Sequence, residues 1–208
     1  MSDTPRDDPR SVDPTKGFFD EQAEKWDESH TAAATIDRIA AVGDLMELQS
    51  GQELLEVGCG TGVLTAWLAD RVGAEHVTAV DFSRNMIEKA RVKGIGAEFR
   101  VADVCADDLG SERYDVVLCF HSFPHFRDQQ AALNRIAAAL KPEGRLIVMH
   151  LRGRSEINAF HDEIGGPVAG HHLPDVDAFD SLLARAGLER TELVDREGLY
   201  FLEARRAG

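Results

Sequence analysis

Short apolar runs alternate with amphipathic stretches along the chain from about residue 52 to residue 164. The apolar runs span residues 53–58, 76–81, 97–103, 114–120 and 144–151. Strands buried on both faces of a sheet have this pattern. The other stretches, in which apolar residues recur every three or four positions as in helices, span residues 61–72, 83–92, 128–140 and 155–164. This alternation predicts right-handed crossovers and a doubly wound, parallel α/β sheet.

Further elements are expected at the two ends of the chain. Apolar residues at helical spacing predict helices over 17–30 and 31–48. A third amphipathic stretch, 176–187, ends at Gly187, a residue type that often follows the last turn of a helix. Two strand-like runs then flank residues 196–198, which predicts an antiparallel hairpin at the edge of the sheet.

Together these elements predict a Rossmann-like fold with a mostly parallel seven-stranded sheet and a C-terminal antiparallel hairpin strand. Residues 1–15 combine charges with prolines and are predicted to be a disordered tail. Residues 16–208 are predicted to form a single domain, because a chain of this length buries one core. Within it, 16–50 are expected to be cap helices and 151–175 an insert that carries histidines.

Charge and cysteine content narrow the possible partners and compartments. The 208 residues include 37 acidic and 23 basic side chains, for a net charge of −14, which disfavours nucleic acid and anionic membrane surfaces. No apolar run approaches the roughly 18 residues that cross a bilayer, and the N-terminus lacks the apolar stretch of a signal peptide. The three cysteines have no CxxC spacing, so we expect a reducing, cytoplasmic location.

A glycine-rich turn follows the first apolar run, in the sequence EVGCGTG at positions 56–62. Glycines at the first βα turn of such a fold let backbone and helix N-terminus come close to a ligand. The spacing is GxGxG with Val63 next, whereas a dinucleotide site would have GxGxxG and a phosphate loop would have GK followed by Ser or Thr. The turn therefore favours a nucleotide-like ligand other than NAD or ATP.

Two further acids end the next two predicted strands. Asp81 ends VTAVD and Asp103 ends RVAD. The carboxyl ends of parallel strands share one edge of the sheet, so both acids are expected in one cleft with the glycine turn. A carboxylate at the position of Asp81 can accept two hydrogen bonds from ribose hydroxyls. The sequence thus predicts a ligand with a ribose but no need for phosphate.

At these residues the sequence resembles the class I S-adenosylmethionine-dependent methyltransferases, from about Phe18 to the C-terminus. The similar segments are EVGCGTG at 56–62, VDFS at 80–83, Ala102-Asp103, and LKPEGRLIV at 140–148. The resemblance implies S-adenosyl-L-methionine as cofactor and transferase activity. FFDEQAEKWDE near the N-terminus is similar to the helix that covers the cofactor in many members of the family that act on small molecules.

The resemblance also implies roles for individual residues. The backbone of Gly58, Cys59 and Gly60 is expected to contact the methionine part of the cofactor. Glu56 is expected to order that end, and Asp81 to bind the ribose. The remaining cofactor contacts are expected from Phe18, Trp26, Phe82, Met86, Asp103, Val104 and Phe120.

Histidines gather in the second half of the chain, where the acceptor side of the site is expected. His121 and His125 follow the fourth predicted strand, and His150 ends the fifth. A neutral imidazole near pH 7 can deprotonate a hydroxyl, thiol or amine, so these three are the candidate catalytic residues. A strand-end histidine bonded to a nearby carbonyl is the structural alternative for each.

The predicted function is methyl transfer to a small-molecule oxygen, nitrogen, sulfur or metalloid acceptor, because little chain remains to recognise a macromolecule. No NPPY-type tetrapeptide follows the fourth predicted strand, which disfavours nucleobase amines. Two alternatives stay open: a metal- or corrinoid-linked enzyme and a catalytically silent cofactor-binding module. No metal is predicted, and the candidates should one bind are His161, His171 and His172, whose spacing matches no metal signature.

Overall fold

The computed structural model describes residues 14–23 and 31–207. The predicted tail, except for its last two residues, and Trp26 lie outside the described residues. Helix α1 (Pro14–Gln22) begins two residues before the predicted domain. It is followed by α2 (Thr31–Val42), which continues as a 3₁₀ turn over Gly43–Met46.

The predicted seven-stranded sheet is confirmed, with the strand order β3-β2-β1-β4-β5-β7-β6. The first five strands are parallel to one another, and β7 pairs antiparallel with both β5 and β6. The strands are β1 (Leu54–Val57), β2 (Val77–Asp81), β3 (Glu98–Val101), β4 (Tyr114–Phe120), β5 (Leu140–His150), β6 (Leu188–Arg196) and β7 (Leu199–Arg206).

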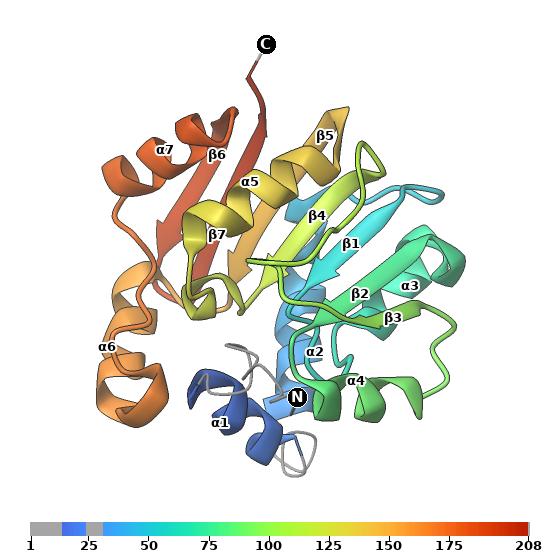
Figure 1. Cartoon of the computed structure of the whole chain (residues 1–208), viewed down its shortest axis with the longest axis horizontal. Coiled ribbons are helices and arrows are strands. Elements are labelled where there is room, and N and C mark those ends of the chain that lie inside the picture. Colours follow the sequence, from blue (N-terminus) through green and yellow to red (C-terminus); the bar gives the residue numbers. More distant parts are fainter. Residues whose placement is uncertain (1–13, 24–30, 208) are drawn as a thin grey trace, which may run out of the picture.

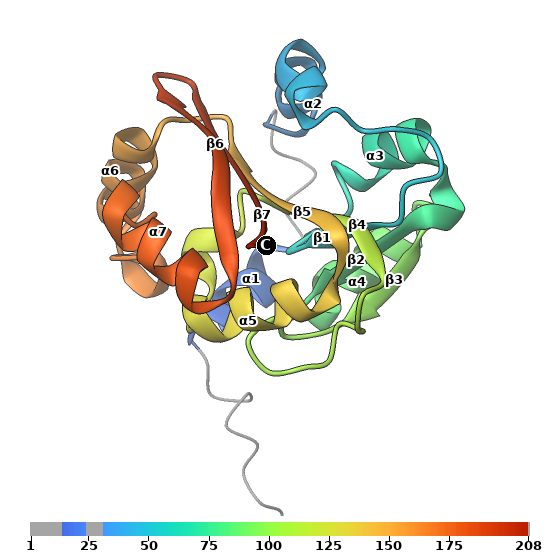
Figure 2. The same cartoon turned by 90° about the horizontal axis from the view of Figure 1, so that it is seen from above.

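Helices cover both faces of the sheet, as Figure 2 shows for α2 and α3 on one side and α5 on the other. The helices along the sheet and after it are α3 (Thr65–Val72), α4 (Arg84–Arg91), α5 (Gln129–Ala139), α6 (Arg154–Ile164) and α7 (Val176–Arg185). Buried side chains of α2 and α3 pack on one face, and those of α5 and α7 pack on the other. Residues of β1 and β2 are buried throughout, which explains their continuously apolar pattern.

One strand boundary differs from the prediction. Strand β5 begins at Leu140, four residues before the expected run. Tyr114 of β4 pairs with Leu140, whereas Val116 pairs with Arg145, so the segment between these partners bulges out of the ladder. Polar residues in the bulge hid this first part of the strand from a reading of apolar periodicity.

The predicted C-terminal hairpin is confirmed. Strands β6 and β7 are joined at residues 197–198, and Gly198 has a φ of +76° in the turn. Gly187, the predicted glycine after α7, has a φ of +71°, a conformation that costs glycine least. Between β5 and β7, the Arg145 guanidinium pairs with Glu203 at 2.7 Å, and both side chains are buried.

The carboxyl ends of the parallel strands point towards one edge of the sheet, and α1 lies beside that edge (Figure 1). The opposite edge carries a polar network. In the described part of the chain, no helix is long and apolar enough to cross a membrane. The fold thus places the ends of β1, β2, β3 and β4 around one common space.

Candidate functional site

A cavity lies at the carboxyl edge of the parallel strands, and together with its open mouth it holds about 690 Å³ of space not filled by atoms. Val57 and Asp81, the last residues of β1 and β2, contribute to its wall, together with Ala102 after β3 and His121 after β4. Phe19 of α1 closes it from the other side. This position in the fold is where open parallel sheets bind small ligands.

The glycine turn after β1 reaches the cavity wall because two of its residues have no side chain. Gly58 and Gly60 line the cavity with φ values of +76° and +55°. A Cβ atom on Gly58 would lie 2.4 Å from the Cβ of Ser122. The Ser122 hydroxyl in turn donates a hydrogen bond to the Val57 carbonyl at 2.6 Å, which fixes this approach between the ends of β1 and β4.

The backbone donors of this turn are already used within the protein. The N–H groups of Gly58 and Cys59 both donate to the Val80 carbonyl, at 2.8 and 3.1 Å. The Gly60 N–H donates to Asp81 Oδ2 at 2.9 Å. The turn therefore offers a ligand close approach and carbonyl oxygens more than free N–H donors.

Glu56 lies behind the turn. Its side chain is buried and accepts a hydrogen bond of 2.6 Å from the Thr65 hydroxyl at the start of α3. Burial is the main cause that raises the pKa of Glu56 to about 8, and the nearby Asp81 charge adds to it. Glu56 is therefore protonated at neutral pH and lies outside the residues that line the cavity.

Asp81 is held at the cavity wall by two backbone donors. Its Oδ1 accepts the Ser83 N–H and its Oδ2 accepts the Gly60 N–H, each at 2.9 Å. Burial outweighs these bonds and raises the pKa of Asp81 to about 6. Each carboxylate oxygen retains a second lone pair, so Asp81 can still accept hydrogen bonds from a ligand.

Asp103 forms a second polar point of the wall, on the side of β3. Its Oδ1 accepts the Cys105 N–H at 2.8 Å, and its Oδ2 pairs with the Arg127 guanidinium at 2.8 Å. Arg127 also lines the cavity. The ion pair joins the loop after β3 to the loop after β4, so the two loops close around this end of the cavity.

Helix α1 is attached to the start of α4 beside the cavity. Asp20 accepts a hydrogen bond from the Ser83 hydroxyl, and its backbone carbonyl accepts one from Asn85 at 3.2 Å. The Phe19 ring lies 6.0 Å from the Phe82 ring and 5.2 Å from the His125 ring. Helix α1 therefore borders the cavity through Phe19, and its role as a cap over a bound cofactor stays a prediction.

The histidines after β4 border the opposite end of the cavity. His121 and His125 both line it. His121 has a φ of +55°, and its Nε2 accepts the Leu151 N–H at 3.3 Å. The His121 ring is 5.1 Å from the His150 ring at the end of β5. The structure thus brings together the three candidate catalytic histidines that the sequence separates.

These imidazoles are neutral at pH 7. Desolvation, followed by positive charge from Arg152 and Arg38, lowers the pKa of His121. Burial lowers the pKa of His125 to about 3 and that of His150 well below its usual value. His150 Nε2 is buried and has no hydrogen-bond partner among the described protein atoms, so it is available to a ligand or water.

The insert contributes His161 and His171, which meet His125 across the cluster. His125 Nδ1 lies 3.0 Å from His171 Nδ1, and the His125 ring lies 4.8 Å from the His161 ring. His172 instead pairs with Asp162 at 2.8 Å. Among the described residues, no group of three or more His, Cys, Asp or Glu side chains is arranged to hold a metal ion.

The structure brings most of the predicted site residues to the cavity wall and leaves others away from it. The predicted residues that line the cavity are Gly58, Gly60, Asp81, Phe82, Met86, Asp103, Val104, His121 and His125. The predicted residues that do not line it are Phe18, Glu56, Cys59, Phe120 and His150. Sequence reasoning missed Ser122 and Arg127, which also line the cavity. Both follow the fourth predicted strand, and apolar periodicity carries no signal for the direction of their side chains.

Known methyltransferases are similar to this chain in sequence. Residues 54–144 match the family described as Methyltransferase domain. The chain is 29% identical over 184 residues to methyltransferase GfsG of Streptomyces halstedii, covering 78% of this chain and 64% of that protein. It is also 29% identical to phosphoethanolamine N-methyltransferase 3 of Arabidopsis thaliana, over 78% of this chain and 34% of that protein. The chain thus spans 64% of the length of GfsG and 34% of the length of the phosphoethanolamine N-methyltransferase.

The family match and the relatives support a class I S-adenosylmethionine-dependent methyltransferase. A solved structure described as a DhpI-SAH complex has the same fold, with a TM-score of 0.69, 21% identity, and coverage of 93% of this chain and 96% of that one. The predicted family, fold class and cofactor are therefore confirmed.

The residues present fit the cofactor of this family. S-adenosylmethionine carries a ribose, an adenine and a charged sulfonium, and the methyltransferase cavity offers a carboxylate at Asp81 and apolar walls at Met86 and Val104. The absence of a Cβ at Gly58 lets the turn pack directly against Ser122 at the cavity wall.

Proposed function

We propose that the protein transfers the methyl group of S-adenosylmethionine to a small-molecule acceptor. The observation that carries this proposal is one cavity that joins Asp81 and the glycine turn at one end to His121 and His125 at the other. The name of one relative also specifies a small acceptor, phosphoethanolamine. The oxygen, nitrogen, sulfur and metalloid acceptors predicted from the sequence all remain within the proposal.

The half of the cavity near β2 and β3 is proposed to hold the cofactor. Asp81 accepts hydrogen bonds from the ribose hydroxyls, Met86 and Val104 pack against the adenine, and Asp103 with its Arg127 partner lies at the adenine edge. Phe19 and Phe82 cover this half from α1 and from the loop after β2. Glu56 and Cys59 support the turn from behind.

The half near β4 and β5 is proposed to hold the acceptor. When bound, S-adenosylmethionine supplies a methyl group on an activated, positively charged sulfur, so the protein needs no covalent nucleophile. Because its Nε2 accepts the Leu151 N–H, neutral His121 carries its proton on Nδ1 and can donate a hydrogen bond to the acceptor, while His125 can bond the acceptor through Nε2, and both can orient it. Because their pKa values are lowered, they are weak bases, and orientation is the role that their environment supports best.

The two alternatives have less support. A metal- or corrinoid-linked enzyme would use the histidine cluster, yet His161 Nδ1 is bonded to the His171 carbonyl and His172 is paired with Asp162. Only a measurement of turnover distinguishes the proposed enzyme from a module that binds the cofactor without catalysis.

The decisive experiment has two parts. Calorimetric titration measures the binding of S-adenosylhomocysteine, and a turnover assay measures the formation of S-adenosylhomocysteine from S-adenosylmethionine with each member of a panel of acceptors. The Asp81→Ala variant is expected to weaken binding by roughly 5- to 150-fold, because lost ribose hydrogen bonds cost about 1–3 kcal/mol. Unchanged affinity in this variant would remove the proposed role of Asp81.

The Asp70→Asn variant is a matched control, since Asp70 is exposed on α3. It is expected to bind like the natural protein. Circular dichroism on both variants separates a loss of binding from a loss of folding. Binding without turnover across the whole panel would favour the silent module.

A further inference from the structure

The two ends of the cavity differ in charge. Across the sheet, Asp103 and Asp81 lie at β3 and β2, whereas His121 and His125 follow β4. Among the described residues that line the cavity, Asp81 and Asp103 are the only acids, so the acceptor end has none. A protonated amine would therefore find no carboxylate at that end.

Arg152 lies next to the acceptor end, outside the residues that line the cavity. Arg152 directly follows Leu151, whose N–H donates to His121 Nε2. Its half-buried guanidinium lies 3.9 Å from the centre of the Phe160 ring, and Phe160 precedes His161 of the cluster. The charge of Arg152 is also among the causes that lower the pKa of both His121 and His161.

The Arg152 guanidinium keeps its hydrogen-bonding capacity. In the described part of the chain it forms no hydrogen bond or ion pair, and it stacks on the Phe160 ring. Arg38, the other cation near His121, is committed to the carbonyls of Leu151 and Gly198. Arg152 therefore differs from Arg38 in having free donors.

The acids near Arg152 are bound elsewhere. Glu156 lies within range of its charge, but its carboxylate accepts the N–H groups of Gly153 and Gly198, at 2.8 and 2.7 Å. Asp195 accepts the Arg154 N–H at 2.9 Å. These bonds hold both carboxylates away from pairing with Arg152.

We propose that Arg152 binds an anionic oxygen group of the methyl acceptor, a carboxylate or a phosphate. The planar fork of an arginine matches either group with two parallel hydrogen bonds, and partial burial strengthens such a pair. His150, whose buried Nε2 has no hydrogen-bond partner among the described residues, lies beside His121 and outside the residues that line the cavity. The inference rests on the proposed function, because it assigns the acceptor class of the same cavity.

The test measures binding of small anions to protein saturated with S-adenosylhomocysteine. Benzoate and phenyl phosphate are the two anionic probes, and benzamide is the neutral match of benzoate. We expect one of the anions to bind and benzamide to bind more weakly. In the Arg152→Gln variant, the affinity for that anion is expected to fall roughly 10- to 100-fold, as for a hydrogen-bonded charge pair.

Two further variants sharpen the result. Arg152→Lys keeps the charge without the fork and is expected to retain part of the affinity. Arg206→Gln removes the same charge from the last residue of β7, one position past Arg205, which lies opposite Arg145 of β5 in the sheet. This variant is expected to bind the anion like the natural protein.

The inference fails if neither anion binds below about 10 mM, or if Arg152→Gln binds both as the natural protein does. If the natural protein does not bind S-adenosylhomocysteine, it is the proposed function that is overturned. Preference for benzoate indicates a carboxylate acceptor, and preference for phenyl phosphate indicates a phosphate acceptor.

Discussion

Two buried carboxyl groups at the ends of β1 and β2 have raised pKa values and different positions. Asp81 faces the cavity, whereas Glu56 faces the Thr65 hydroxyl at the start of α3. A protonated carboxyl group can donate a hydrogen bond as well as accept one, which suits the buried site of Glu56. The resemblance predicted both acids as cofactor residues, and the structure gives one of them a place behind the site.

Glu56 should make the protein less stable as the pH rises. Its pKa is about 8 in the folded protein and near 4.5 in the unfolded chain, so the folded state binds the extra proton between these values. The free energy of unfolding therefore falls from about pH 5 to pH 8, by at most about 1.4 kcal/mol per unit for this group. In the Glu56→Gln variant, the free energy of unfolding measured by urea denaturation is expected to fall less over the same pH range.

Glu98→Gln is the matched control for that measurement. Pairing with Arg113 lowers the pKa of Glu98, so its stabilisation is present above its unfolded pKa and is lost only at lower pH. Its slope from about pH 5 to pH 8 should equal that of the natural protein. Equal slopes for Glu56→Gln and the natural protein would contradict a raised pKa at Glu56.

At the scale of elements, the site depends on close approach between the turn after β1 and the segment after β4. Gly58 and Ser122 belong to these two segments, and their contact leaves no room for a Cβ atom on Gly58. The ends of two neighbouring strands are thereby held at a fixed separation, on which the cavity depends.

Gly58→Ala is expected to weaken both folding and S-adenosylhomocysteine binding. Its φ of +76° costs about 1–3 kcal/mol for a residue with a Cβ, and the contact with Ser122 adds to this. Gly51→Ala has a similar φ of +83° with no atom within 4 Å, so it is expected to lower stability alone. Thermal unfolding and calorimetric titration measure both effects. Equal binding losses in the two variants would show that strain, and not close approach, matters.

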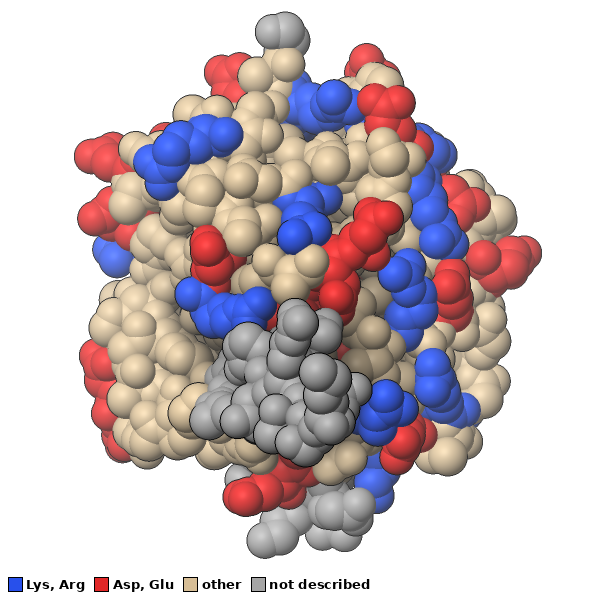
Figure 3. All heavy atoms as spheres, in the orientation of Figure 1, with Lys and Arg blue, Asp and Glu red and all other residues tan. Residues whose placement is uncertain are grey.

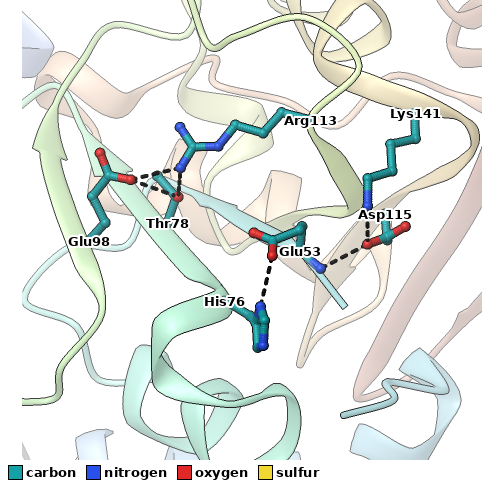
Figure 4. A network of polar contacts seen from close by, with 7 residues as sticks. All are labelled: Glu53, His76, Thr78, Glu98, Arg113, Asp115 and Lys141. Carbon is teal, nitrogen blue, oxygen red and sulfur yellow. Dashed lines mark hydrogen bonds and ion pairs between the residues drawn. The ribbon is translucent and has the colours of Figure 1, made fainter. Parts of the chain in front are cut away.

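At the scale of the molecule, the two edges of the sheet have different tasks. Figure 4 shows the polar network at the amino edge, away from the cavity. Glu53 pairs with His76 at 2.8 Å, and Asp115 pairs with Lys141 at 2.8 Å. Because each of these residues lies within one position of the first residue of its strand, the network joins strands at the edge away from the cavity.

Arg113→Gln is expected to change stability slightly and binding not at all. Arg113 pairs with Glu98 at 2.9 Å, and both side chains are more than two fifths exposed, so the pair contributes less than about 1 kcal/mol. Asp81→Ala should show the opposite balance. Urea denaturation and S-adenosylhomocysteine titration of both variants check this division. A binding loss in Arg113→Gln would show that the two edges are coupled.

Acidic and basic side chains are interspersed on the face shown in Figure 3, so this face carries no extended patch of one charge. The predicted absence of nucleic-acid partners stays a prediction.

By itself, the sequence determined the order of the elements, the parallel sheet and the edge at which a ligand binds. These follow from periodicity and glycine spacing, which express local backbone preferences and the burial of whole strands. The tertiary structure decided which side chains face the cavity. Glu56 turns to Thr65, and His171 meets His125 from 46 positions away. Such directions depend on contacts between distant segments, which no local pattern encodes.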